Sequence, residues 1–132
     1  MLGVGLGITG RALLPNLVNP ASWLTSAGGG TGHATVSNGI LTIAGDGTNA
    51  ATADQQLTTV PGRTYRITAN VATNAIAWTA GTIQGGADVA AQVLTSAGAT
   101  LSTTFVATGT STWIRFAKTS VGDSVVSNIA VR

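Results

Sequence analysis

The sequence predicts an all-β protein, and three observations support that prediction. Many short segments alternate apolar and polar side chains with a period of two, which is typical of half-buried strands. Glycine-rich turns separate these segments, and the chain contains 18 glycines. The sequence lacks an amphipathic stretch of helical period and useful length. About eight to ten short strands at this spacing favour a sandwich or a barrel.

The most regular alternation runs from Ala53 to Thr73, where two segments flank Pro61-Gly62. A Pro-Gly pair suits a tight turn, because proline presets φ and glycine accepts a positive φ. Four apolar residues beyond the turn share one face and are predicted core residues: Tyr65, Ile67, Ala69 and Val71. The pattern therefore predicts a β-hairpin at the centre of the domain.

The remaining segments are assigned by the same pattern. An edge strand is expected at 12–18, because proline is tolerated at a sheet edge, and a flexible loop at the glycine-rich 25–32. Asn38-Gly39 is a strong hairpin signal and predicts a turn between strands at 33–36 and 39–43. Further strands are expected at 76–79, 82–84, 89–94, 100–107, 113–118 and 125–131.

Parity along the strands also sorts the aromatic side chains. Tyr65, Phe105 and Phe116 are predicted core residues. In 113–118, one face carries Trp113, Arg115 and Ala117, and the other carries Ile114, Phe116 and Lys118. Trp78 lies in a less regular stretch and is the best candidate for an exposed tryptophan. Trp23 is expected to pack over the mouth of the sandwich or, if exposed, to stack on a sugar or a base.

Charged residues are scarce, at 8% of the chain against roughly a quarter in typical soluble domains. The formal net charge is +2, and the Lys and Arg residues are scattered rather than clustered, which argues against nucleic-acid binding. A surface so poor in charge predicts contact with copies of the same chain or with a larger assembly. No apolar run has the length of a transmembrane helix, and no basic segment precedes the apolar start, so neither membrane insertion nor secretion is expected.

Residues 1–11 differ in composition from the rest of the chain. They alternate glycine with aliphatic residues, which disfavours an independent strand, although the side chains favour burial. We expect an extended arm that docks on a neighbour's sheet edge or in a groove, and the alternative is a frayed terminus. The residues assigned to docking are Leu2, Val4, Leu6, Ile8 and Arg11. Residues 12–132 are then predicted to form a single sandwich domain.

The inventory of reactive side chains is small. The chain has one histidine, no cysteine and four acidic residues in or beside turns: Asp46, Asp54, Asp88 and Asp123. A small hydrolase would need a polar cluster around His33, and a calcium loop at Asp46 would need more acidic ligands. The sequence therefore predicts no catalytic residue, no metal site and no cofactor.

Several segments carry a family resemblance: LLPNLVNPASW at 13–23, GILTI at 39–43, VPGRTYRITANV at 60–71, TLSTTFVATGTSTWIRFAK at 100–118 and VVSNIAVR at 125–132. From Leu14 to Arg132 their order resembles that of the carbohydrate-binding-module-like jelly rolls common in virion proteins of tailed bacteriophages. The leader MLGVGLGITGR is similar to the leaders of small phage structural proteins. The resemblance implies a two-sheet jelly roll with an extended N-terminal arm, placed in the virion.

The first functional hypothesis is accordingly a structural accessory protein of a phage particle, as a capsid decoration or a head or tail fibre component. It is expected to be made in the host cytoplasm and to dock through its arm on capsid, portal or tail proteins. It is also expected to self-associate, with a trimer as the expected form. The alternative is a glycan-binding adhesin module that contacts host polysaccharide through Trp78 or Trp23.

Overall fold

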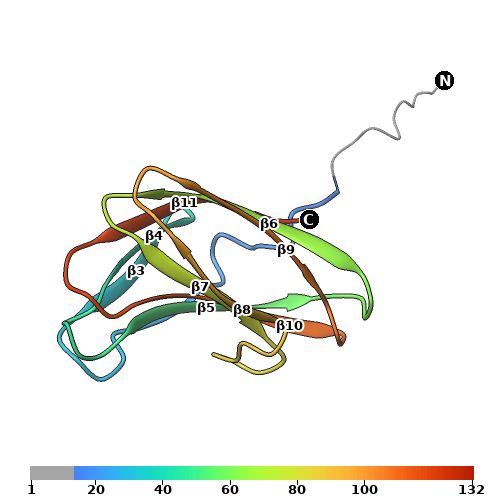
Figure 1. The fold of residues 1–132 in the computed structure, drawn as a ribbon, viewed down its shortest axis with the longest axis horizontal. Helices are drawn as coiled ribbons and strands as arrows, with labels where there is room; N and C mark the ends of the chain where they lie inside the picture. Colours follow the sequence, from blue (N-terminus) through green and yellow to red (C-terminus); the bar gives the residue numbers. More distant parts are fainter. Residues whose placement is uncertain (1–13) are drawn as a thin grey trace.

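The computed structural model describes residues 14–132, which fold into two antiparallel sheets of five strands each (Figure 1). The first, called here the β10 sheet, has the order β2 (Leu24–Ser26), β5 (Ala51–Thr58), β10 (Ser111–Lys118), β7 (Ile76–Gly81) and β8 (Ala90–Thr95). The second, called the β6 sheet, has the order β3 (His33–Ser37), β4 (Ile40–Ala44), β11 (Ser124–Val131), β6 (Thr64–Ala72) and β9 (Thr100–Val106). The predicted jelly-roll β-sandwich is confirmed.

The core lies between the two sheets and is built by strict alternation. In β10, Ile114 and Phe116 are fully buried, and in β6 the predicted core residues are at most 5% exposed: Tyr65, Ile67, Ala69 and Val71. Aromatic rings link the two layers, with centroids 5.9 Å apart for Trp78 and Phe105. Burial of such large apolar side chains is the main stabilising contribution to a sandwich of this size.

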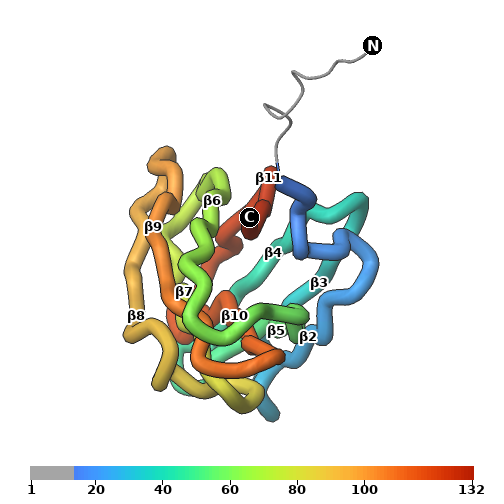
Figure 2. The backbone as a smooth tube through the Cα atoms, turned by 90° about the vertical axis from the view of Figure 1, so that its right-hand side faces the viewer, coloured from blue at the N-terminus to red at the C-terminus, as the bar shows by residue number. Residues whose placement is uncertain are grey.

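The prediction of a β-hairpin at 53–73 is wrong, because its two strands belong to different sheets. β5 pairs with β2 and β10, whereas β6 pairs with β11 and β9, as Figure 2 also shows. Between them the chain crosses at Pro61-Gly62, where the Gly62 N–H donates to the Ala107 carbonyl and the Val60 N–H donates to the Tyr65 hydroxyl. Each strand buries its apolar face against the opposite layer, and the turn carries the chain from one layer to the other.

The second predicted hairpin is confirmed. β3 and β4 pair directly, with Ser37 opposite Ile40 and only Asn38-Gly39 between them. Both turn residues have positive φ, 50° and 75°, as a two-residue type I′ turn requires.

Two other local predictions are wrong, and a third is right only in part. The chain forms no strand in the described part of 12–18, because the Asn16 and Gln55 side chains replace a strand ladder there. Asn16 bonds the Ile129 carbonyl and the Val18 and Val131 amides, while Gln55 bonds both backbone groups of Asn19. Residues 82–84 form a bend and turn, and the predicted flexible loop 25–32 begins inside the short strand β2.

The predicted docking residues Leu2, Val4, Leu6, Ile8 and Arg11 lie outside the described residues, so the arm and its boundary at residue 11 stay predictions. Within 14–132 there is no helix that is long and apolar enough to cross a membrane.

Candidate functional site

The outer face of the β10 sheet carries a row of side chains that crosses all five strands. The pairing register places Ser26, Thr52, Ala117, Ala77 and Leu94 side by side in that order. Since neighbouring strands lie about 4.8 Å apart, the row spans about 19 Å. Its three central members are small, so they form a low floor across the sheet.

A second row runs parallel to this floor and contains the charged residues of the face. It places Leu24, Asp54, Arg115 and Thr79 in register. Asp54 is only 2% exposed and accepts hydrogen bonds from Arg115 Nε at 2.6 Å and Nη2 at 2.8 Å. The hydrogen bond to Asp54 raises the pKa of Arg115, and partial desolvation opposes this effect. The guanidinium is therefore a fixed cation beside the floor.

The loop between β7 and β8 supplies a third polar group. Gln84 Nε2 donates to Asp54 Oδ2 at 2.9 Å, so the loop reaches over β10 to β5. Asp88 stabilises the loop by accepting hydrogen bonds from the Thr82 N–H and hydroxyl, and these bonds lower the pKa of Asp88. Gly85 has φ +79°, and a Cβ there would lie 2.9 Å from Arg115 Cζ. Glycine thus lets the loop backbone lie directly against the guanidinium.

Two hollows flank this polar group. One, of about 330 Å³, is lined by Leu24, Ser26, Thr52, Asp54, Gln84 and Arg115 among others. The other, of about 580 Å³, is lined by Ala77, Gln92, Leu94, Ala117 and neighbouring residues. Both are also lined by Ala50, so the two hollows adjoin there, and together they are called the groove. Leu24 and Leu94 are 53% and 66% exposed, which leaves apolar surface at each end.

Trp113 is half-buried on the same face, between Gln56 and Gly81 in the register. Its position presents an aromatic side chain to solvent next to the exposed amide of Gln56. Trp113 lines neither hollow, but it lies two positions along β10 from Arg115 on the same face. A polar ligand that extends beyond the groove can therefore contact its aromatic ring as well as the exposed amides and the guanidinium.

The two tryptophans predicted to contact a ligand are core residues instead. Trp78 is 1% exposed and Trp23 is 7% exposed, so neither offers its ring to solvent, and the structural alternative for Trp23 holds. Trp78 shares the inward face of β7 with Ile76 and Ala80. The sequence contained the signal for Trp113, since strand parity put it on the same face as Arg115, opposite the core residues of β10.

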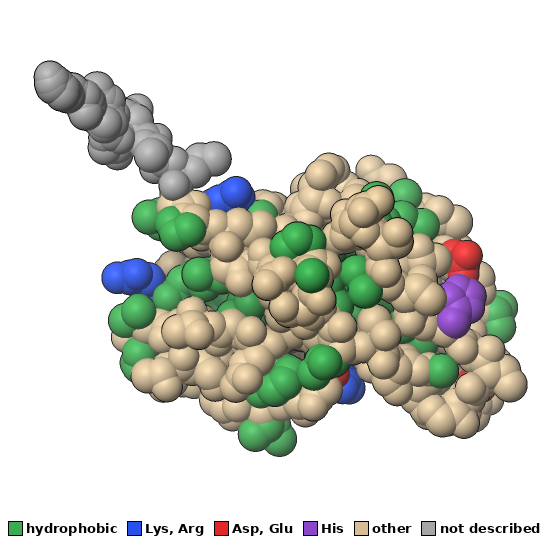
Figure 3. Space-filling model, turned by 180° about the vertical axis from the view of Figure 1, so that it is seen from behind, with side chains coloured by type: hydrophobic (Ala, Val, Ile, Leu, Met, Phe, Trp, Pro, Cys, Tyr) green, Lys and Arg blue, Asp and Glu red, His purple; other side chains and the backbone are tan. Residues whose placement is uncertain are grey.

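The remaining candidates do not converge on that groove. His33 Nε2 lies 2.8 Å from Asp123 Oδ1, with both side chains about half exposed; Figure 3 shows the histidine beside a carboxylate at one end of the molecule. The pair supplies the carboxylate that a hydrolase would need, but no hydroxyl within 14–132 bonds the imidazole. Asp46 accepts its hydrogen bonds from Thr31, Thr48 and Asn49. The described part of the chain has no group of three or more His, Cys, Asp or Glu side chains suited to a metal ion.

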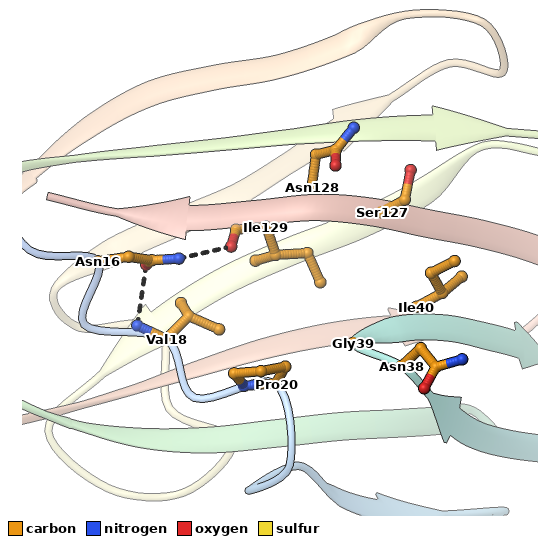
Figure 4. Close-up of a pocket in the computed structure, with 9 residues that line it drawn as sticks. All are labelled: Asn16, Val18, Pro20, Asn38, Gly39, Ile40, Ser127, Asn128 and Ile129. Atoms are coloured by element: carbon orange, nitrogen blue, oxygen red, sulfur yellow. Dashed lines mark hydrogen bonds between the residues drawn. The ribbon is translucent and has the colours of Figure 1, made fainter.

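A separate hollow of about 280 Å³ lies between the N-terminal segment, the Asn38-Gly39 turn and β11 (Figure 4). Its lining includes the apolar residues Val18, Pro20 and Ile129. Asn16 also lines it, but the Asn16 side-chain amide is hydrogen-bonded to the backbone of Val18 and Ile129. Ser127 and Asn128 point to the opposite side of β11 from Ile129. This hollow therefore lacks the cluster of convergent polar groups found on the β10 sheet.

Comparison with known proteins identifies similar structures only. Neither a protein-family model nor a curated protein matches this sequence. A solved structure of the enzymatically active domain of tailspike protein 4 from bacteriophage CBA120 is similar at TM-score 0.61 and 16% identity over 88% of this chain. The chain spans 21% of the length of that tailspike chain.

Two carbohydrate-binding modules are similar over nearly their whole length. TmCBM61, solved in complex with β-1,4-galactotriose, has TM-score 0.57 and 12% identity, with 90% of this chain and 99% of that one covered. A CBM4 structure has TM-score 0.59 and 17% identity, with 86% and 87% covered. At these identities the likeness establishes a carbohydrate-binding-module-like jelly roll as the fold.

Proposed function

We propose that this chain is a noncatalytic carbohydrate-binding module whose ligand lies in the groove on the outer face of the β10 sheet. The similarity to two carbohydrate-binding modules supports the class of function. The observation that carries the proposal is the buried carboxylate of Asp54, which holds Arg115 and Gln84 beside an open groove.

This arrangement is poorly explained by stability alone. A buried ion pair repays its desolvation only in part, and apolar replacements of similar volume are often neutral or stabilising. Such a pair on a solvent-facing groove is the kind of local departure from good packing that marks functional sites. The groove also combines apolar ends with a few fixed polar groups, the usual composition of a ligand site.

Trp113 supplies the aromatic contact in this proposal. The flat apolar face of a sugar ring matches an exposed indole, and truncating such an aromatic anchor commonly costs more than 1–2 kcal/mol of binding. We expect Trp113→Ala to weaken polysaccharide binding by about tenfold or more, while Trp113→Phe retains most of the affinity.

The test is a glycan array, followed by affinity electrophoresis in soluble polysaccharides. Arg66→Lys is the matched control, because Arg66 is exposed on the other sheet and bonds Ser102 there. Binding of the wild type and the control, with loss in Trp113→Ala, supports the proposal. An array without signal, or equal binding by Trp113→Ala, overturns it.

A second candidate function, compatible with the first, is that of an accessory component of a bacteriophage particle. The similarity to a phage tailspike domain favours it, and the charge-poor composition suits a chain that contacts copies of itself or other virion proteins. Residues 1–11 would then dock on capsid, portal or tail proteins, with the sandwich, as a trimer, facing outward.

Deletion of residues 2–11 separates these roles. In particles assembled with the deleted chain we expect incorporation to be lost, because the docking side chains are gone. The thermal unfolding midpoint and glycan binding should stay at wild-type values, because the core and the groove lie within 14–132. Undiminished incorporation would contradict the docking role of the arm.

A further inference from the structure

Asp54 binds two side chains that differ in the hydrogen-bonding groups they leave free: Arg115 has free donors, and Gln84 has a free acceptor. A guanidinium has five N–H donors and no acceptor. Arg115 uses two of them on Asp54, and no described residue accepts the others. Arg115 therefore offers only donors, and its side chain is 30% exposed beside the groove.

The orientation of the Gln84 amide follows from its partner. Asp54 accepts from Arg115 through both of its carboxylate oxygens, so Gln84 turns its NH₂ group toward the Asp54 Oδ2 atom. The Gln84 carbonyl oxygen then points away from Asp54, and no described residue donates to it. Because Arg115 Nη2 and Gln84 Nε2 bond the same oxygen, Asp54 Oδ2, the donor and the acceptor lie side by side.

We propose that Arg115 and Gln84 together recognise two adjacent hydroxyl groups on an uncharged sugar chain, with Arg115 donating to one oxygen and Gln84 Oε1 accepting from the other. This inference rests on the proposed carbohydrate-binding function and names the ligand class. A hydroxyl can accept and donate, so two neighbouring hydroxyls match one donor and one acceptor.

The charges around the groove offer no free cation to attract an acidic sugar. The Arg115 cation is neutralised by Asp54 at hydrogen-bonding distance, so an incoming carboxylate meets no net positive charge. Lys118 lines the far end of the groove and keeps its charge, but it is only 6% exposed, and its Nζ donates to the Ser120 carbonyl and hydroxyl and to the Val121 carbonyl, so it is not available to pair with a ligand. Binding should accordingly be insensitive to salt, because no exposed ion pair forms with the ligand.

The probes differ in where free hydroxyls lie on the interior sugars. Galactan, mannan and xylan with 1,4 linkages keep O2 and O3 free and adjacent. A 1,3-linked glucan has O3 blocked and no adjacent pair, and polygalacturonate adds a carboxylate to a 1,4-linked chain. Periodate oxidation cleaves the C2–C3 bond between the adjacent hydroxyls of the neutral 1,4-linked polymers, and reduction then stabilises the opened ring. Affinities for the full-length chain are measured by affinity electrophoresis and calorimetry.

We expect at least one neutral 1,4-linked polymer to bind. Relative to that polymer, the affinity should fall about tenfold or more for its periodate-treated form, for the 1,3-linked glucan and for polygalacturonate. Gln84→Ala and Arg115→Lys should each weaken binding about tenfold, with Arg66→Lys unchanged. Wild-type thermal unfolding of each variant shows that the loss is local.

Preference for polygalacturonate or for the 1,3-linked glucan, binding that survives periodate, or full affinity in Gln84→Ala would overturn this inference and leave the proposed function standing. The absence of binding to every polymer and to the array would overturn both. Should Arg115→Lys fail to fold, Gln84→Ala and the periodate comparison decide the outcome.

Discussion

Asp54 is the residue on which the candidate site depends, because it contacts both polar groups that line the groove while its own carboxylate is 2% exposed. Removing a carboxylate from such a position leaves a partly desolvated guanidinium without its partner. Breaking a pair of this kind is expensive even where the intact pair adds little stability. The residue therefore links the geometry of the groove to the stability of the domain.

We expect Asp54→Asn to lower the free energy of unfolding by about 1–3 kcal/mol, because a neutral amide cannot replace the charge-assisted bonds to Arg115. Urea unfolding followed by tryptophan fluorescence measures the change. Asp123→Asn is the control, since Asp123 pairs with His33 at the surface and such pairs contribute about 0–1 kcal/mol. Equal effects of the two substitutions would contradict this assessment of Asp54.

At the scale of elements, Asp46 joins two loops that sequence patterns treat as separate. Its carboxylate accepts hydrogen bonds from the N–H groups of Thr31, Thr48 and Asn49 and from the Asn49 amide, at 2.6–3.2 Å. These bonds, led by that from the Asn49 N–H, hold the pKa of Asp46 well below its ordinary value. A Cβ on Gly30 would lie 2.0 Å from the carboxylate, so the loop needs glycine there.

The lowered pKa of Asp46 predicts how the stability of these loops depends on pH. The contribution of the carboxylate is complete above its unfolded pKa, near 3.8, and is lost as the pH falls toward the lower folded value. Wild type should lose stability from about pH 4 downward, whereas Asp46→Asn should start less stable and lose less over that range. Urea unfolding at pH 7, 4 and 3 measures both, and parallel loss in the two proteins would contradict the prediction.

The elements show what a single sequence can and cannot predict. The Asn38-Gly39 turn and the alternation in β6 and β10 were predictable, because turn chemistry and strand parity are local. Pro61-Gly62 marked a turn correctly, but whether a turn joins paired strands or crosses between layers depends on which sheet buries each apolar face. The segment near Asn16 was missed as well, because side-chain bonds to residues more than 100 positions away fix it.

At the scale of the whole molecule, the site exists only through the sheet order. Gln84 and Arg115 lie 30 and 61 positions from Asp54 in the sequence, and no spacing rule connects them. Parity could place Trp113 and Arg115 on one face, yet only the pairing of β10 with β5 and β7 brings the three polar residues together. The fold could therefore be predicted from local sequence patterns, whereas the site could not.

Because the groove spans the whole β10 sheet, ligand binding should stabilise the domain as one unit. A ligand at about 100 times its Kd that binds only the folded state adds about 2.7 kcal/mol, which raises Tm by roughly 10 °C for a domain of this size. Scanning calorimetry with the best-binding oligosaccharide measures the shift. At the same concentration Trp113→Ala, with about tenfold weaker binding, should show about half of it. An unchanged Tm in wild type would contradict the prediction, because a ligand that binds only the folded state must raise Tm.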